Sequence, residues 1–276
     1  MRILLTGGSG FIGRHVLRAL EAEKHEIVLT TRRSGVDFSK MQSADDWMAL
    51  LDGVDVVINC VGIIVETSTQ TFADIHVHAP SALFHACVRA GVKRVIQISA
   101  LGADEQAFTP YQLSKRAADE VLRHLPVEWF VIRPSLVYGE GGASAALFER
   151  LANLPLIPLL GQGRQQIQPV HVDDLVETVM RCLLATPAHR TLDVVGAYPV
   201  SFVEWLQTIR RACGKRKAPT LPIPFSFVLI SARWLRFLIP LSHPDNIRML
   251  QRGNVADVLP LAGFLGHMPR SVEAFR

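Results

Sequence analysis

Residues 2–13 read Arg2-Ile-Leu-Leu-Thr-Gly-Gly-Ser-Gly-Phe-Ile-Gly13. The apolar run before the glycines predicts a buried strand, and the pattern after them predicts a helix, so the glycines fall in the turn between the two. Such a turn brings the free amides of a helix start close to an anion, and glycine leaves the backbone accessible. We therefore predict a dinucleotide pyrophosphate site made by Gly7, Gly8, Ser9, Gly10, Phe11, Ile12 and Gly13.

Short β-rich runs alternate with helical patterns through the first half of the chain. The predicted strands are 3–6, 27–31, 54–60, 92–99 and 129–133, and the predicted helices are 11–22, 44–51, 72–90 and 111–125. Strict alternation implies a parallel sheet covered by helices on both faces. We predict an α/β fold: a Rossmann-type doubly wound parallel sheet in residues 1–135 and a smaller C-terminal substrate cap in 136–276. Segments around 165–195 are expected to return to the Rossmann core.

The composition excludes several classes of protein. With 49% apolar and 20% charged residues over 276 positions, the chain has the content of a globular protein. Its four cysteines lie far apart without a Cys-x-x-Cys pair, which predicts reduced thiols and no metal site. A net charge of +4 without interleaved aromatic residues argues against a nucleic-acid partner. No apolar run approaches the roughly 20 residues of a membrane span, so we expect a cytoplasmic protein with a small-molecule substrate.

A basic cluster and an apolar segment lie in the second half of the chain. The cluster consists of Arg210, Arg211, Lys215, Arg216 and Lys217, and residues 225–239 are apolar on nearly every side. The apolar segment predicts either a buried cap helix, which is the commoner outcome, or a surface that meets a partner or membrane. Peripheral contact with the inner face of a membrane, or with a membrane complex, through 210–240 therefore stays open. The sequence does not predict the oligomeric state.

The residues about twenty positions after the glycines bear on the choice of cofactor. A protein that prefers NAD places a carboxylate there for the ribose hydroxyls. This chain has Thr30 and Thr31 followed by Arg32 and Arg33, and arginine pairs with a 2′-phosphate. NADP(H) is therefore favoured over NAD(H). Contacts of the cofactor with Asp37, Phe38, Cys60, Val61 and Gly62 are further predictions.

Tyr111 and Lys115 are four residues apart on a predicted helix, so both side chains project from one face. A nearby ammonium favours the phenolate, which would lower the pKa of Tyr111 and let its hydroxyl exchange a proton with a substrate carbonyl or alcohol. We therefore predict an acid or base at Tyr111, assisted by Lys115.

Five motifs together resemble the short-chain dehydrogenase/reductase superfamily: Thr6-Gly-Gly-Ser-Gly-Phe-Ile-Gly13, Asn59-Cys-Val-Gly62, Tyr111-x-x-x-Lys115, Arg133-Pro-Ser and His171-Val-Asp-Asp174. The resemblance covers most of residues 1–195 and is strongest to an atypical, extended group. That group includes the NADPH-binding accessory subunit of mitochondrial complex I and its bacterial relatives, and it overlaps the NAD-dependent epimerases and dehydratases. The resemblance implies that Lys115 touches the nicotinamide ribose and that Arg133 and Pro134 border the cofactor.

Three departures from the superfamily pattern bear on catalysis. The family usually has two serines at the end of the strand before the Tyr-Lys helix, whereas this chain has Ser99-Ala100, which makes Ser99 a candidate for polarising a carbonyl. The segment from Ser99 to Tyr111 is shorter than in sugar-nucleotide enzymes, and His76 replaces the usual asparagine. We interpret His76 and His78 as packing residues, with a place near the site also open for His76, and Asp173 and Asp174 as caps of a helix start.

Three functions remain open. We favour an NADPH-dependent oxidoreductase acting on a small or lipophilic carbonyl or quinone-like substrate. The second is a non-catalytic NADPH-binding module for redox sensing or assembly of a membrane complex, which would explain Ala100. The third, a sugar-nucleotide epimerase or dehydratase, is disfavoured by the short segment after Ser99 and by the arginines at 32 and 33.

Overall fold

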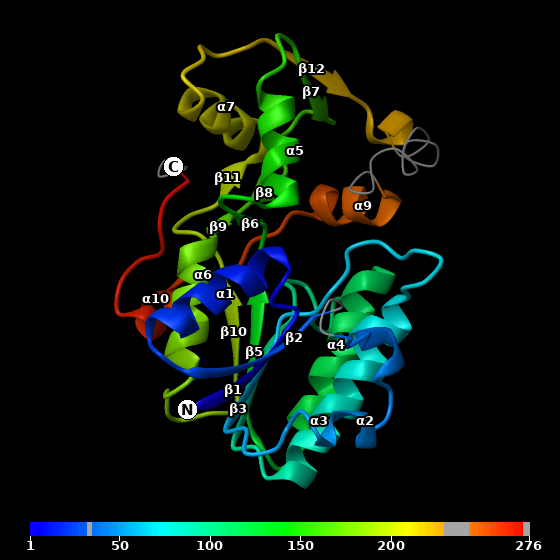
Figure 1. The fold of residues 1–276 in the computed structure, drawn as a ribbon. Helices are drawn as coiled ribbons and strands as arrows, with labels where there is room; N and C mark the ends of the chain where they lie inside the picture. The colour runs from blue at the N-terminus through cyan, green and yellow to red at the C-terminus, as the bar shows by residue number, and fades with distance from the viewer. Residues whose placement is uncertain (32–34, 229–242, 273–276) are drawn as a thin grey trace. The chain divides into compact units, whose positions relative to one another are not determined.

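The computed structural model describes residues 1–31, 35–228 and 243–272, and these form two compact units (Figure 1). The first unit contains Met1–Arg133 and Leu175–Leu192, and the second contains Pro134–Asp174 and Asp193–Arg276. Arg32 and Arg33, and most of the apolar segment 225–239, lie outside the described residues. Each unit has its own core.

The first unit is organised around a six-stranded sheet with the order β10-β5-β4-β3-β1-β2. Its strands are β1 (Arg2–Thr6), β2 (Glu26–Thr30), β3 (Val56–Asn59), β4 (Arg94–Ile98), β5 (Glu128–Pro134) and β10 (Arg190–Val194). The pairings from β2 through β5 are parallel and in regular register, with Leu4 between Val28 and Val57. The strand order reverses at β1 and β3, and ligands of open α/β sheets bind at such a switch point, outside the carboxyl ends of the strands.

Helices cover both faces of this sheet (Figure 1). One face carries α1 (Phe11–Ala22) and α6 (Val172–Cys182), and the other carries α2 (Asp45–Met48), η3 (Ala73–His78), α3 (Ala79–Ala90) and α4 (Pro110–Arg123). A short 3-10 helix, η2 (Phe38–Lys40), follows β2. The core under α2, α3 and α4 contains the fully buried Trp47, Leu83 and Phe84. Burial of the strands on both faces explains why they are apolar throughout.

Two helices differ from the sequence prediction. The predicted helix 44–51 is only four residues long as α2, and its ends are completed by turns. The predicted helix 72–90 begins with the π-helical η3 before it becomes α3, so its first six residues are wound more widely than an α-helix. Wider turns of this kind occur often at functional sites.

The second unit combines short strands with helices α5 (Ala143–Ala152), α7 (Phe202–Ala212), α9 (Pro244–Arg252) and α10 (Leu259–Leu265). Its strands are β6 (Val137–Tyr138), β7 (Ile157–Leu160), β8 (Gln166–Ile167), β9 (Val170–His171), β11 (Val200–Ser201) and β12 (Thr220–Ile223). The buried Tyr138 and Trp205 contact edge to face, with ring centroids 5.1 Å apart, at the centre of its core. The second unit is therefore held together by side-chain packing around these rings, and its sheets have only two strands each among the described residues.

The α/β, Rossmann-type fold class predicted from the sequence is confirmed by the parallel six-stranded sheet. Asp174 lies in the first turn of α6, at the helix start predicted from the sequence. Its buried carboxylate accepts hydrogen bonds from the backbone N and from Nη1 of Arg270, both at 2.8 Å, and so ties the last described segment to its unit. Within the described part of the chain, no helix is long and apolar enough to cross a membrane.

Candidate active site

The three glycines lie at the carboxyl end of β1 in very close contact with neighbouring backbone. Gly7 has a φ of +72°, and a Cβ there would lie 2.8 Å from the backbone carbon of Cys60. A Cβ at Gly13 would lie 2.1 Å from the carbonyl oxygen of Gly7, and the Gly10 N–H donates to that same oxygen at 2.9 Å. A side chain at Gly7 or Gly13 would therefore push the turn apart.

The amino-terminal end of α1 is open to an anion. Its N-cap residue, Gly10, supplies no side-chain hydrogen bond, and no acidic residue lies in the first turn. The first amides of a helix lack intrahelical partners and carry a partial positive charge. Uncapped amides without a competing carboxylate fit the diphosphate of NAD(P), so the residues present are compatible with that cofactor.

Buried polar side chains connect the carboxyl ends of the three central strands. Thr6 Oγ1 donates to Asn59 Oδ1 at 2.6 Å, and Asn59 Nδ2 donates to Gln97 Oε1 at 2.7 Å. Asn59 Oδ1 also accepts from the backbone N of Val61 at 3.2 Å, which turns the chain after β3. Because the two bonds between the strands are buried and satisfied, this ladder fixes β1, β3 and β4 beneath the glycine loop.

Lys115 is presented to the same edge of the sheet by α4. The helix begins at Pro110 because Thr109 Oγ1 caps it by accepting the Gln112 N–H, and proline suits the first helical position. The buried ammonium of Lys115 donates to the carbonyl oxygens of Ile98 at 3.0 Å and Val61 at 3.4 Å. A Cβ at Gly62 would lie 3.1 Å from Lys115 Nζ, so the ammonium lies close against the backbone of Gly62.

Tyr111 lies one turn before Lys115 and packs among aromatic rings. Its ring contacts those of Phe72 and His76 edge to face, with centroid distances of 5.9 and 5.6 Å. Burial, followed by the charge of Asp119, raises the pKa of Tyr111 to about 12. The predicted lowering by Lys115 is therefore wrong for this structure, because desolvation dominates while the ammonium is held by backbone carbonyls. Tyr111 is a neutral phenol at physiological pH and is suited to donate a proton.

His76 is a neutral side chain whose tautomer is fixed by its neighbours. Its Nε2 accepts from the backbone N of Ile63 at 3.0 Å, so Nδ1 carries the proton and donates to Ser114 Oγ at 2.9 Å. Burial, with the charge of Lys115, lowers the pKa of His76 to about 2. The ring also stacks on Phe72 at 5.2 Å. The packing interpretation agrees with the burial of His76 and is wrong for His78, which is exposed.

Ser99 contacts a buried acid. Its Oγ donates to Asp119 Oδ2 at 2.5 Å, and both side chains are buried. The other oxygen, Oδ1, is buried without a hydrogen-bond partner among the described residues. Burial raises the pKa of Asp119 to about 7, against the opposing effects of Ser99 and Lys115. In this structure the Ser99 hydroxyl is bonded to Asp119, and a role for Ser99 in polarising a substrate carbonyl stays a prediction.

Asp119 and Lys115 influence each other's protonation. Burial lowers the pKa of Lys115 to about 8, and the charge of Asp119 opposes that fall. An acid at about 7 and an ammonium at about 8, one turn apart on α4, form a buried pair whose charges change near neutral pH. Asp119 was missed in the sequence, although its position four residues after Lys115 puts it on the same helix face.

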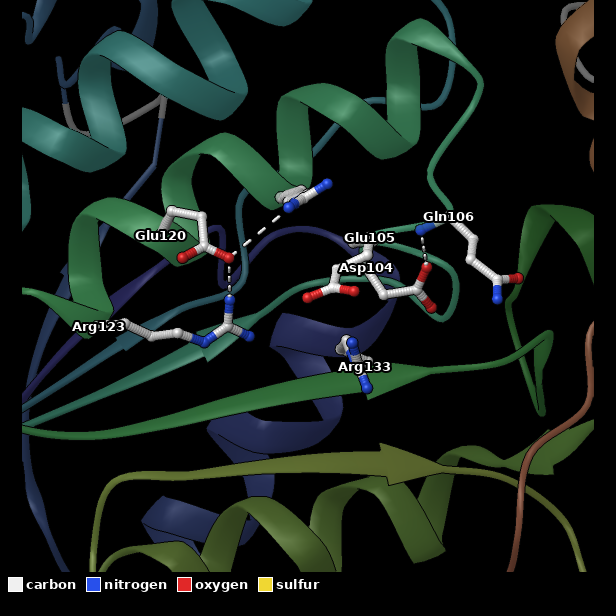
Figure 2. A pocket seen from close by; sticks show the side chains of 8 residues that line it. Asp104, Glu105, Gln106, Glu120, Arg123 and Arg133 are labelled. Atoms are coloured by element: carbon white, nitrogen blue, oxygen red, sulfur yellow. Dashed lines mark hydrogen bonds and ion pairs between the residues drawn. The ribbon is translucent and has the colours of Figure 1, made fainter.

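Arg133 lies in a separate pocket of about 490 Å³ beside α4 (Figure 2). Figure 2 shows its side chain near the acidic side chains of Asp104 and Glu105, while Glu120 pairs with Arg123 at 2.7 Å. Three arginines and three carboxylates line this pocket, so its charges balance: Arg116, Arg123 and Arg133, with Asp104, Glu105 and Glu120. A contact between Arg133 and the cofactor stays a prediction.

The remaining predicted cofactor residues have local structural contacts. Asp37 Oδ1 accepts from the N and Oγ of Ser39, and Phe38 is buried against Trp47 with a centroid distance of 5.3 Å. Burial raises the pKa of the Cys60 thiol to about 12. Phe11 and Ile12 open α1, Gly8 packs on Leu29, and Ser9 is exposed. Cofactor contacts of these residues, and of Val61 and Pro134, stay predictions.

Comparisons with known proteins agree with this geometry. The sequence model described as NAD dependent epimerase/dehydratase family matches residues 3–194. A ceramide reductase of Caulobacter vibrioides is 28% identical over 62% of this chain and 57% of that protein, so the chain spans little more than half of this relative. The mitochondrial NADH dehydrogenase (ubiquinone) 1 alpha subcomplex subunit 9 of Mus musculus is 27% identical over 97% of this chain and 76% of that protein.

Solved structures share the fold. MoeE5 in complex with UDP-glucuronic acid and NAD has a TM-score of 0.73 at 22% identity, covering 100% of this chain and 96% of that one. A UDP-glucuronic acid 4-epimerase from Bacillus cereus in complex with NAD has a TM-score of 0.74 at 18% identity, covering 99% and 95%. Since the family match extends over more than half of the sequence, the chain belongs to the NAD dependent epimerase/dehydratase family.

Proposed function

We propose that the chain is an NADPH-preferring reductase of a lipophilic carbonyl or quinone-like compound. The observation that carries the proposal is the approach of Lys115 Nζ to Gly62, where a Cβ would lie only 3.1 Å from the ammonium. Gly62 follows the carboxyl end of β3, so this contact places Lys115 next to the edge of the sheet where we propose that the cofactor binds. Tyr111 lies one turn before Lys115 on the same helix. A group held by the glycine loop would therefore have an acid beside it.

The residues of the chain can perform the proton-transfer half of a reduction. When bound, the nicotinamide supplies a hydride to the carbonyl carbon. The phenol of Tyr111, with a pKa of about 12, retains its proton at neutral pH and donates it to the carbonyl oxygen as negative charge develops there. Lys115, whose ammonium is held by the carbonyl oxygens of Ile98 and Val61, is assigned to the nicotinamide ribose rather than to lowering the pKa of Tyr111. One hydride and one proton convert the carbonyl group to an alcohol.

The substrate class is proposed from one relative. The Caulobacter vibrioides protein is named a ceramide reductase, and it matches 62% of this chain. A ceramide is a lipid, so this name favours a lipophilic carbonyl over a polar sugar nucleotide. The solved structures are similar in fold alone at 17–22% identity, and the sugar nucleotides that some of them bind are the natural competing substrates to test.

The preference for NADPH is proposed from the end of β2. Thr30 and Thr31 are followed by Arg32 and Arg33, so no carboxylate occupies the position that would repel a 2′-phosphate. Arginine binds phosphate through charge-assisted, bidentate hydrogen bonds. Both arginines lie outside the described residues, so the proposal rests on the sequence.

A non-catalytic NADPH-binding module is the second candidate. The bond from Ser99 Oγ to Asp119 favours it, because this hydroxyl is turned away from a substrate and Ala100 offers no replacement. The similarity to a protein named as a subunit of NADH dehydrogenase also supports a role in a membrane complex. Such a module would bind the cofactor without turnover.

The test is NADPH oxidation by the purified chain with a long-chain keto lipid, a quinone and UDP-glucuronic acid as separate substrates. We expect turnover with the keto lipid or the quinone, and a loss of about a hundredfold or more in kcat for Tyr111→Phe. Tyr198→Phe is the matched control, because Tyr198 is exposed in the second unit. Titrations should show tighter binding of NADPH than of NADH, with the preference lost in Arg32→Ala and Arg33→Ala.

Each alternative has its own outcome. Cofactor binding without turnover of any substrate would replace the reductase with the non-catalytic module, and turnover of UDP-glucuronic acid alone would replace it with a sugar-nucleotide enzyme. Equal affinity for NADPH and NADH would overturn the cofactor preference. Equal activity of Tyr111→Phe and the unmodified chain would remove Tyr111 from the mechanism.

A further inference from the structure

Three exposed leucines lie on neighbouring segments of the second unit, the loop after α5 and β12. Figure 1 shows β12 beside β7, the strand that follows this loop. Leu154, Leu156 and Leu221 expose 40%, 44% and 47% of their surface. They are neighbours because β7 and β12 are parallel with Thr220 opposite Ile157, and because the Ile157 N–H donates to Pro219 O at 3.0 Å. Clustered exposed leucines are uncommon on a surface that meets only water.

Exposed cations lie at the end of α7 and on the loop just before β12. Arg211 lies in the last turn of α7, and Lys215, Arg216 and Lys217 occupy the loop that leads to β12; all four are exposed. None of them forms an ion pair within residues 1–31, 35–228 and 243–272. The positive charge is therefore available to an anionic partner.

Arg210 connects the end of α5 and the loop after it, residues 152–156, to the cationic loop 213–219. Its Nη1 donates to the carbonyl oxygens of Ala152 and Leu154, both at 2.8 Å, and its Nε donates to Arg216 O. Lys215 Nζ reaches Asn153 O at 3.4 Å. These bonds cross-link residues 152–154 to 215–216, so the apolar and basic groups form one ordered surface rather than two unrelated loops.

We propose that this surface, made of Leu154, Leu156, Leu221, Arg211, Lys215, Arg216 and Lys217, docks on an anionic lipid bilayer. Interfacial binding requires apolar side chains that enter the headgroup region and cations that meet anionic lipids, and both are present here. Nucleic acid satisfies only the cations, since the three leucines would lie unused against phosphates. The inference uses no residue of 229–242 and does not depend on the proposed reductase activity.

The test is co-sedimentation of the whole chain, without cofactor or substrate, with phosphatidylcholine vesicles that contain phosphatidylglycerol. Vesicles of phosphatidylcholine alone are the neutral reference. We expect binding to the anionic vesicles that weakens as salt is added. The double variant Arg216→Glu/Lys217→Glu should bind at least about tenfold more weakly, since each cation near a bilayer contributes about 1 kcal/mol. Leu156→Ser/Leu221→Ser should also weaken binding at unchanged net charge.

The controls carry the same chemical changes at exposed sites in the first unit. Arg18→Glu/Lys24→Glu removes the same charge from α1 and the turn after it, and Leu184→Ser replaces a leucine that is 78% exposed. Neither should reduce sedimentation comparably. Hydrogen exchange on the vesicles should show protection of residues 153–156 and 215–223.

Three results would overturn the proposal. The first is equal binding to neutral and anionic vesicles. The second is vesicle binding that both double variants retain at full strength. The third is binding of duplex DNA without binding of vesicles. The third result would assign the surface to nucleic acid. Thermal unfolding of every variant confirms that it is folded before its binding is compared.

Discussion

The glycine loop and the buried face of α4 lie at the same edge of the first unit's sheet, but they handle charge in different ways. Around Gly7, Gly10 and Gly13 the partial charges are those of backbone amides, and the first turn of α1 holds no acidic residue. On α4 the charges belong to titratable side chains with shifted pKa values, Lys115 and Asp119 among them. Substitutions in the glycine loop should therefore weaken cofactor binding by steric clash, equally at every pH. Substitutions on the α4 face should instead change how activity and stability depend on pH.

The largest effect that would separate the two regions is expected for Gly13→Ala. The new Cβ would lie 2.1 Å from the carbonyl oxygen of Gly7, and this oxygen belongs to backbone that cannot turn aside. An overpacked contact costs about 1–3 kcal/mol, which corresponds to cofactor binding weakened by up to about a hundredfold. Fluorescence titration with NADPH at several pH values measures the loss, which should be the same at each pH.

Gly263→Ala is the matched control for this substitution. Gly263 lies in α10, and a Cβ there meets nothing within 4 Å. Alanine in place of a helical glycine raises the free energy of unfolding by about 0.5–1 kcal/mol. This variant should therefore unfold at a slightly higher urea concentration and bind the cofactor as the unmodified chain does. Normal cofactor binding by Gly13→Ala would show that the close approach is not required.

The difference between the two regions also explains what could be predicted from the sequence. The glycine loop is a local pattern between a strand and a helix, so its place at the end of β1 follows from a dozen consecutive residues. Tyr111 and Lys115 were found by their helical spacing. The bond from Ser99 to Asp119 spans 20 residues and depends on how β4 packs against α4, which no local pattern encodes. The pKa of Tyr111 was predicted in the wrong direction because burial cannot be weighed against a neighbouring charge before both are placed.

The next effect is a change of pH dependence in Asp119→Asn. The charge of Asp119 supports the ammonium of Lys115, so its removal should lower the pKa of Lys115 below about 8. If the ammonium is the active form, the alkaline limb of kcat/KM moves to lower pH, and activity at pH 8 falls by about threefold to tenfold. A pH–rate profile measures the movement. An unmoved limb, or a move to higher pH, would remove Asp119 from the control of Lys115.

The same variant has a predicted sign in stability. The pKa of Asp119 is raised from 3.8 to about 7 by folding, so the native state holds a proton that the unfolded chain has lost between these values. The free energy of unfolding therefore falls as pH rises from about 4 to 7, by an amount on the order of 3 kcal/mol. Asp119→Asn should lack this fall in urea unfolding. Ser99→Ala should steepen it, because the Ser99 hydroxyl lowers the pKa of Asp119.

The smallest effect is expected for His76→Gln. The ring is neutral, and glutamine can still accept the Ile63 N–H. The substitution removes the ring contacts with Phe72 and Tyr111 and the bond from Nδ1 to Ser114 Oγ. We expect a loss of about twofold to fivefold in kcat and about 1 kcal/mol in the free energy of unfolding at pH 7. His78→Gln is the control, since His78 is exposed and pairs with Asp74 at 3.5 Å, and it should leave kcat unchanged.

The pH dependence of His76→Gln decides whether the buried ring acts as described. Folding lowers the pKa of His76 from 6.5 to about 2, so between these pH values the unfolded chain binds a proton at His76 and the native state does not. The free energy of unfolding of the unmodified chain therefore falls as the pH drops below about 6.5. The glutamine variant has no such titrating group and lacks this part of the fall. The stability advantage of the unmodified chain at pH 7 should therefore shrink and then change sign as the pH falls to 4, so that the glutamine variant becomes the more stable of the two. An advantage of the unmodified chain that grows as the pH falls would mean that His76 is protonated in the folded protein, and the fixed tautomer beside Tyr111 would be wrong.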